Sequence, residues 1–390
     1  MNKVIETRRS ATLAQQPATQ GTGEDEVSGV DETADGTEYE DVGITKPFDP
    51  TLINILTKQM SLDTLIKRMR EQEIDLSPDF QRAEVWKPAA RSRLIESLLI
   101  RIPLPAFYMD ATEEDHWLVV DGLQRLATLR DFVIRKSMRL QDLEFLNDFQ
   151  GFNIDDLPRQ YQRRIEETQV TVYLIEKGTP GDVKFNIFKR INTGGLPLSA
   201  QEIRHALNQG AVTAFLKQLA DSQEFQQATY HGIDDKRMAA RECVLRFMAF
   251  TLTPPERYKA ADFDAFLSDA MAAMNKMSPE ERDTLAARFR RALKASYSIF
   301  RDAAFRKPKG KNRFPINKAL FEVWTVTLDN QSDDRLRTLE QNRDRVRQKI
   351  EDFMREDRDF LNAISQGTGD IAKVQLRFSR FRNALEGAIS

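Results

Sequence analysis

One short segment, residues 117–133, constrains the fold of this chain more than any other. An apolar run, Trp117–Val120, is followed by the polar sequence Asp121-Gly122-Leu123-Gln124-Arg125 and then by an amphipathic run, Leu126–Val133. This order predicts a strand, a tight glycine turn and a helix. The N–H groups at the start of such a helix lack partners, so the turn is suited to hold an anion, above all phosphate.

Two charged side chains extend what this turn can do. Arg125 would offer phosphate oxygens a planar, permanently charged fork, and Asp121 would hold a metal ion or a water molecule. The alternative is structural: Asp121 caps the helix and Arg125 is a solvated side chain. The pentapeptide alone leaves both interpretations open.

Length and composition indicate a protein of two or three domains with a sizeable core. The chain has 390 residues, of which 41% are hydrophobic and 30% charged. No apolar run approaches the ~18 residues of a membrane span, and the N-terminus has no apolar core of signal-peptide type. The single cysteine, Cys243, excludes an internal disulfide, and the three histidines do not stand in metal-binding spacing. We therefore expect a cytoplasmic protein with no membrane partner.

Charge and polarity separate the first 45 residues from the rest. Residues 1–45 hold ten acidic and three basic residues, a balance of −7, and the remaining 50 acidic and 55 basic residues give +5. This tail has almost no apolar pattern, so we predict that it is disordered. Residues 46–178 alternate strand and helix patterns and predict a small mixed domain. Residues 179–390 show only helical patterns, which makes the expected fold class α+β.

Periodicity and capping signals predict individual elements. In the first domain we expect a helix within Thr51–Met69, a helix from Pro88, and strands at Ala106–Met109 and Val170–Ile175. In the helical domain we expect a helix over Asp182–Ile191 and one exposed helix over Asp334–Arg355. We also expect helices that begin at the capping boxes Ser199–Glu202 and Ser278–Glu281.

Two further segments place polar side chains next to apolar anchors. Gln81 and Arg82 lie between two aromatic residues, and Arg190 and Asn192 precede the glycine pair Gly194-Gly195. Rigidly anchored donors of this kind suit a binding site. The alternative is that the first segment is a tied-down irregular loop and the second a corner between two helices.

A basic cluster occurs in the helical domain. Five of the eight residues in 306–313 are basic, and the segment also contains proline and glycine. Such a cluster suits phosphate backbones and gives the expected DNA contacts, although a solvated loop is the alternative. The expected DNA-binding residues are Arg306, Lys307, Lys309, Lys311 and Arg313.

The sequence contains neither an HNH nuclease motif nor a G-x-S-x-G hydrolase motif. His231 is the only histidine beside a Gly/Asp loop, and no histidine companion follows it. No serine or cysteine stands in a G-x-S-x-G elbow. A self-sufficient nuclease is therefore the weakest of the functional hypotheses.

Taken in order, these segments resemble the N-terminal domain of GmrSD-type restriction endonucleases, a family related to the ParB/sulfiredoxin-like fold. The resemblance covers about residues 55–250 and implies a ParB/sulfiredoxin-like domain over 46–178, followed by the all-helical domain. The matching segments are Phe80-Gln81-Arg82 with Val85-Trp86, Ile102-Pro103-Leu104-Pro105, Asp121–Leu126, and Asn192-Thr193-Gly194-Gly195 with Leu198 and Glu202-Ile203-Arg204.

The resemblance implies a nucleotide pocket whose family signature is DGQQR. Leu123 replaces the first glutamine of that signature. The expected catalytic residues are Asp121 and Arg125, with Asp121 as the metal ligand for Mg²⁺ bound with a nucleoside triphosphate. The expected nucleotide-binding residues are Gln81, Arg82, Gly122, Gln124, Arg125, Arg190 and Asn192.

In relatives, this domain binds and hydrolyses a nucleoside triphosphate and regulates a nuclease directed at phage or modified DNA. The nuclease is often a fused HNH domain, whose motif this chain lacks. The resemblance therefore implies a regulatory subunit that acts with a nuclease on another polypeptide. The expected partners are nucleotide, DNA and that nuclease, and a homo-oligomer is left open. The alternative function is a non-catalytic nucleotide- or DNA-binding module that recruits a partner.

Overall fold

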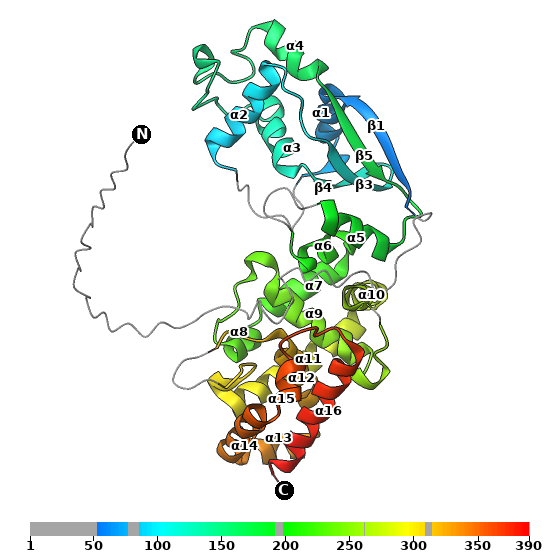
Figure 1. Ribbon diagram of the computed structural model, residues 1–390, viewed down its shortest axis with the longest axis vertical. Helices are drawn as coiled ribbons and strands as arrows, with labels where there is room; N and C mark the ends of the chain where they lie inside the picture. The colour runs from blue at the N-terminus through cyan, green and yellow to red at the C-terminus, as the bar shows by residue number, and fades with distance from the viewer. Residues whose placement is uncertain (1–52, 77–85, 192–197, 261, 309–313, 390) are drawn as a thin grey trace, which may run out of the picture.

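A computed structural model describes residues 53–76, 86–191, 198–260, 262–308 and 314–389. Within them the protein is α+β: the strands lie between residues 55 and 175, and the remainder is mostly helical. This confirms the expected fold class. Figure 1 shows the sheet with α1–α4 at one end of the molecule, α7–α16 at the other, and α5 and α6 between them.

The sheet has five strands in the order β1-β5-β3-β4-β2. β3 pairs antiparallel with β4 and parallel with β5, β1 pairs antiparallel with β5, and β2 pairs parallel with β4. The strands are β1 (Ile55–Ser61), β2 (Ile74–Asp75), β3 (Phe107–Glu113), β4 (His116–Asp121) and β5 (Gln169–Ile175).

The first strand corrects one sequence prediction. We expected helix within Thr51–Met69, but Ile55–Ser61 is a strand, and helix α1 begins only at Leu62. β1 is an edge strand with most of its side chains exposed, so it carries no alternating apolar pattern. It is held by pairing with β5, which lies more than one hundred residues later in the chain.

Each face of the sheet packs against a separate set of helices. One face, with Met109, Val119 and Val172, packs against α1 (Leu62–Arg70), α2 (Pro88–Leu99), α3 (Leu123–Leu129) and α4 (Arg159–Glu167). The other face, with Val120 and Ile175, packs against α5 (Gly181–Ile191) and α6 (Ala200–Leu207). The strands end before residue 178, as we expected, but α5 and α6, the first two helices after it, pack against the sheet. The domain boundary at residue 178 stays a prediction.

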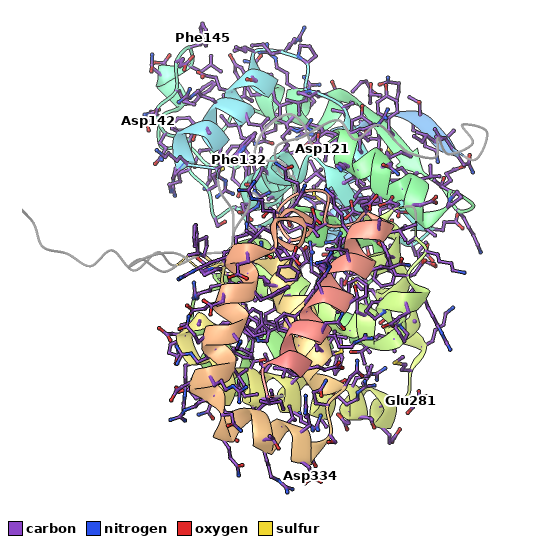
Figure 2. All side chains as sticks on the ribbon, turned by 60° about the horizontal axis from the view of Figure 1, so that its bottom comes forward. Asp121, Phe132, Asp142, Phe145, Glu281 and Asp334 are labelled. Carbon is purple, nitrogen blue, oxygen red and sulfur yellow. The ribbon has the colours of Figure 1, made fainter. Side chains whose placement is uncertain are left out.

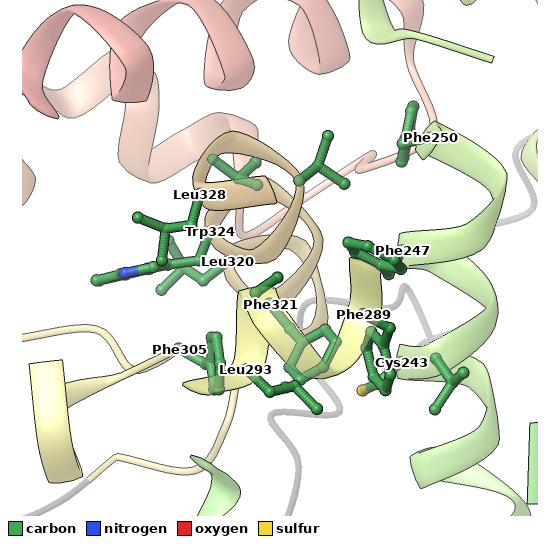
Figure 3. Packing of buried hydrophobic residues seen from close by; sticks show 14 of the residues in the cluster. Cys243, Phe247, Phe250, Phe289, Leu293, Phe305, Leu320, Phe321, Trp324 and Leu328 are labelled. Atoms are coloured by element: carbon green, nitrogen blue, oxygen red, sulfur yellow. The ribbon is translucent and has the colours of Figure 1, made fainter. Parts of the chain in front are cut away.

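The helical half is built around α12, which is buried on all sides. α12 contacts α9, α11 and α16, and Figure 3 shows its aromatic residues Phe321 and Trp324 among Phe247, Phe289 and Phe305. The helices of this half are α7 (Ala211–Ala220), α8 (Gln223–Thr229), α9 (Ala239–Leu252), α10 (Phe263–Lys276), α11 (Pro279–Phe300), α12 (Lys318–Asp329), α13 (Asp333–Gln341), α14 (Arg343–Glu356), α15 (Arg358–Ala363) and α16 (Ile371–Gly387).

Local capping signals were reliable guides to helix starts. Both predicted capping boxes form, with reciprocal hydrogen bonds between Ser199 and Glu202 and between Ser278 and Glu281. The single helix expected over Asp334–Arg355 is wrong, because α13 and α14 are separated at Asn342. The Asn342 side chain donates to the Thr338 carbonyl at 2.8 Å, a local bond that competes with helix continuation.

Among the residues that the structure describes, no helix combines the length and the apolar character needed to cross a bilayer.

Candidate functional site

The Gly122 turn has the predicted form of strand, glycine and helix. Asp121 is the last residue of β4, Gly122 has φ +101° and precedes α3, and the Leu126 N–H donates to the Gly122 carbonyl at 3.0 Å. A Cβ at Gly122 would overlap the Phe107 ring. Backbone conformation and packing against Phe107 therefore both require glycine here. The first N–H groups of α3 have no carbonyl partner within the helix.

Irregular pairing marks the strand that leads into this turn. The register of β3 against β4 shifts between Tyr108 and Met109, and Tyr108 lies opposite Asp121. Such irregularities re-aim side chains and are frequent beside active sites. The Tyr108 ring also stacks on Tyr173, with ring centroids 4.7 Å apart. Burial, with smaller effects of Tyr173 and Asp121, raises the pKa of Tyr108, so its hydroxyl stays protonated at neutral pH.

Arg125 is enclosed by the protein rather than solvated. It is 8% exposed, its guanidinium lies 4.5 Å from the centre of the Phe107 ring, and it donates to the Pro105 carbonyl and, at 3.1 Å, to the Ala106 carbonyl. Its Nη2 also donates to Asp121 Oδ2 at 2.7 Å. Burial lowers the pKa of Arg125, and Asp121 offsets part of that effect. Arg125 is therefore not the solvated side chain of the structural alternative. Its binding of phosphate stays a prediction.

Asp121 is the more accessible member of this pair. Its side chain is 36% exposed, against 10% for that of Arg125. An Asp carboxylate held from one side by an arginine and reachable by water has the ligand chemistry that Mg²⁺ requires, since this ion prefers oxygen ligands and keeps several waters. Within the described part of the chain, no three His, Cys, Asp or Glu side chains gather as a metal site. A Mg²⁺ at Asp121 would therefore complete its shell with phosphate oxygens and water.

The next two residues of the motif point to different surroundings. Leu123 packs into the core between the sheet and α1–α3, so an apolar residue fits at the position where the resemblance implies glutamine. Gln124 is half-buried, and its backbone carbonyl accepts a hydrogen bond from Thr128 at 2.7 Å.

The remaining expected nucleotide residues are only partly placed. Arg190 is exposed in the last turn of α5, a helix that contacts β4. Gln81, Arg82 and Asn192 lie outside the described residues. Their convergence with Asp121 and Arg125 on one site stays a prediction.

A buried ion-pair cluster after the C-terminal end of α3 was not predicted from the sequence. α3 continues as a π-helical turn, Arg130–Ile134, a form that is rare and often found at functional sites. Asp131 in this turn is 5% exposed and pairs with Arg91 of α2 at 2.5 Å and with Arg130 at 2.8 Å. Burial opposes its ionisation, but the hydrogen bonds from Arg130 and Arg91 prevail and lower the pKa of Asp131. The available signal was an acidic residue within an apolar helical pattern.

Arg204, part of the segment Glu202-Ile203-Arg204 that carries the family resemblance, points into the helical half. It is 1% exposed and pairs with Asp264 of α10 at 2.5 Å and with Glu242 of α9 at 3.7 Å. Glu242 also pairs with Arg246 and Lys318. The segment therefore joins α6 to the helices beyond it, and Glu202 acts in the capping box.

The basic cluster is anchored at its first residue. Arg306 is 7% exposed and donates to the carbonyls of Phe314 and Thr229, the latter at 3.5 Å. Lys307 is half-buried, and Lys309, Lys311 and Arg313 lie outside the described residues. DNA contact by this cluster stays a prediction, with Arg306 placed to anchor the segment.

Comparison with known proteins relates part of the chain to a protein family. Residues 62–208 match the family model of the GmrSD restriction endonuclease N-terminal domain. The matched region runs from the first residue of α1 to the residue after α6, so it includes the Gly122 turn and Arg204. Neither a curated protein nor a solved structure gave a match. The expected relation to the ParB/sulfiredoxin-like fold stays a prediction.

Proposed function

Since residues 62–208 match the family model of the GmrSD restriction endonuclease N-terminal domain, we propose that the protein is a nucleotide-dependent regulatory subunit of a DNA restriction or phage-defence system. It binds and hydrolyses a nucleoside triphosphate in the cytoplasm and acts with a nuclease on another chain. The observation that carries the proposal is the Asp121–Arg125 pair at the Gly122 turn, where a partly exposed carboxylate lies at the start of a helix.

In this proposal the backbone and the side chains of the Gly122 turn have different roles. The N–H groups of the first turn of α3 bind phosphate oxygens. Asp121 holds Mg²⁺ or orients the attacking water. Arg125 keeps the Asp121 carboxylate in place through the 2.7 Å hydrogen bond and adds positive charge beside the phosphates. Gln81, Arg82, Gln124, Arg190 and Asn192 complete the nucleotide site.

A second candidate function has its own supporting observation. Arg125 already donates to two backbone carbonyls and to Asp121, which is what a purely structural arginine would do. A non-catalytic module that binds nucleotide or DNA and recruits a partner would need the turn but no hydrolysis. The two candidates differ only in turnover.

Phosphate release decides between them. The purified chain is incubated with Mg²⁺ and each of the four ribonucleoside triphosphates, with and without DNA, and nucleotide binding is measured in parallel. The proposal expects Mg²⁺-dependent release from at least one triphosphate. Binding without release in every condition supports the non-catalytic module, and the absence of both binding and release contradicts the nucleotide site itself.

A further inference from the structure

A strained arginine follows α11, the longest helix that the structure describes. Arg301 follows α11 with φ +53° and ψ −130°, a combination that belongs to the first central position of type II′ turns, which glycine dominates. Residues held in such regions cluster at functional sites, because strain persists only where something retains it. The side chain, rather than the backbone, is therefore the reason to keep an arginine at this position.

The strained backbone places Arg301 against an aromatic pair. Its guanidinium carbon lies 4.9 Å from the centre of the Tyr297 ring, in cation–π geometry. Tyr297 in turn contacts Tyr230, with ring centroids 5.7 Å apart and ring planes inclined by 40°. Both rings are half-buried, and His231 beside them is exposed. Tyr230 and His231 also have positive φ, 54° each.

The arrangement joins two distant parts of the chain. Tyr230 follows α8, Tyr297 lies in the last turn of α11, and α8 contacts the turn Arg301–Ala303. In Figure 1, α8 marks this flank of the helical half. Burial, then Tyr297 and Asp302, raises the pKa of Tyr230, so the ring stays neutral with its hydroxyl as a donor.

Two arginines, Arg301 and Arg306, lie close to this aromatic pair. Arg306 donates to the carbonyl of Thr229, the residue before Tyr230, at 3.5 Å, and the half-buried Lys307 follows it in the chain. The nearby acidic residues are engaged: Asp302 lies 3.3 Å from Arg347, and Glu224 lies 3.6 Å from Lys294. Aromatic faces and cations thus meet at one surface, which is the combination that binds single-stranded nucleic acid.

We propose that Tyr230, Tyr297, Arg301 and Lys307 form a binding surface for single-stranded nucleic acid, distinct from the Gly122 turn and outside the matched region 62–208. Bases stack on the tyrosine rings, and the phosphates contact Arg301 and Lys307. Duplex DNA is disfavoured at this surface, because paired bases keep their faces stacked within the helix and present only edges and backbone.

The test uses the full chain and fluorescence anisotropy at about 50 mM salt, where phosphate contacts are strong. The probes are oligo(dT) and oligo(U) of about 20 nucleotides, long enough to cover a site of this class, and a duplex of equal length. Two probes of different sugar distinguish DNA from RNA as the natural ligand. The variants are Arg301→Gly, Tyr297→Leu and Tyr297→Phe, with Lys58→Gln on the exposed edge strand β1 as the charge-matched control.

The two Tyr297 variants separate stacking from packing. Tyr297→Leu should weaken single-strand binding about tenfold, whereas Tyr297→Phe keeps the ring and should bind within about twofold of the parent chain. Arg301→Gly should also weaken binding about tenfold. The same variant should raise the melting temperature, since glycine adopts the Arg301 backbone conformation without strain.

Several outcomes overturn the proposal. One is that Arg301→Gly and Tyr297→Leu bind single strands as the Lys58→Gln control does. Another is that Tyr297→Leu weakens duplex binding as much as it weakens single-strand binding, because the proposed stacking acts only on unpaired bases. Because Arg301→Gly is expected to be the more stable protein, its loss of binding cannot be attributed to unfolding.

Discussion

Arg125 and Asp121 are joined by a hydrogen bond of 2.7 Å across one helical turn, yet the side chain of Asp121 is 36% exposed and that of Arg125 only 10%. Because of this difference in exposure, the two residues have different roles in the proposed nucleotide site. Truncation of Arg125 to alanine should abolish nucleotide binding, but it also leaves two carbonyls and a carboxylate without their donor. Substitution of Asp121 is the cleaner probe.

Asp121→Asn should bind nucleotide and lose hydrolysis. The amide oxygen still accepts the hydrogen bond from Arg125, whereas the charge that would hold Mg²⁺ or orient water is gone. Asp121→Ala should likewise spare binding and stop turnover. Both variants are measured by phosphate release and by equilibrium nucleotide binding, and hydrolysis at the parent rate in either would leave only the binding-module function.

Gly122→Ala should destabilise the sheet domain. Alanine at this position would have to adopt φ +101°, and its Cβ would overlap the Phe107 ring, which is fully buried. Overpacking of this kind costs about 1–3 kcal/mol, and the backbone strain adds about 1–2 kcal/mol. Denaturant unfolding measures the loss, and Gly151→Ala is the control, since Gly151 also has positive φ but meets no atom within 4 Å. Equal losses in the two variants would show that the Phe107 contact is unimportant.

Glu96 should make stability depend on acid pH. This carboxylate of α2 is 3% exposed and accepts N–H bonds from Glu144, Phe145 and Leu146 at 3.0, 2.7 and 2.8 Å. Burial raises its pKa, but the three backbone bonds prevail and the net shift is downward. Figure 2 shows Phe145 at the edge of the molecule, in the segment that these bonds secure.

The sign of the effect follows from this lowered pKa. The carboxylate contributes its full stabilisation above the unfolded value of about 4.3, and the contribution is lost as pH falls through the lower folded pKa. Glu96→Gln should cost about 1–3 kcal/mol at neutral pH, because its NH₂ group cannot accept those bonds. Unfolding measured between neutral and acid pH should show a flatter pH dependence for the variant. An unchanged profile would contradict the assignment.

Arg204→Met should destabilise the junction between α6 and the helical half. Asp264 and Glu242 would both lose a partner, and removal of one member of a buried pair costs about 3–5 kcal/mol. Adding Asp264→Leu should recover part of that loss. Chemical denaturation of the two single variants and the double variant gives the coupling, with the exposed Arg337→Met as the control, expected within about 0.5 kcal/mol of the parent. Strictly additive losses would rule out the pairing.

The basic cluster should bind duplex phosphate with a steep salt dependence. Five phosphate contacts predict a log–log slope of roughly −4 to −5, and about 0.9 less steep if Arg306 serves only as the anchor. Deletion of residues 1–45 should tighten binding if the acidic tail shields the cluster. Charge reversal of Lys307, Lys309 and Lys311 should then undo the gain. If neither change alters duplex affinity at low salt, the cluster is a solvated segment.

Local chemistry allowed the sequence to specify the elements around the site. The apolar run before Asp121, the glycine at a positive φ and the two capping boxes each act over a few residues, so their signals survive in the sequence alone. The Gly122 turn was therefore predictable, as were α2, β4, β5 and α5. Leu123 could also be assigned an inward direction from helix geometry.

Only the tertiary structure decided the features whose partners are distant in the chain. β1 is a strand because β5 pairs with it, Arg125 is buried because the carbonyls of Pro105 and Ala106 accept from it, and Arg204 is an anchor because Asp264 lies opposite. In each case the residue's own preferences are compatible with several surroundings, and burial with a specific partner selects one. A sequence records which groups are available for such contacts, whereas the packing of remote segments determines which of them meet.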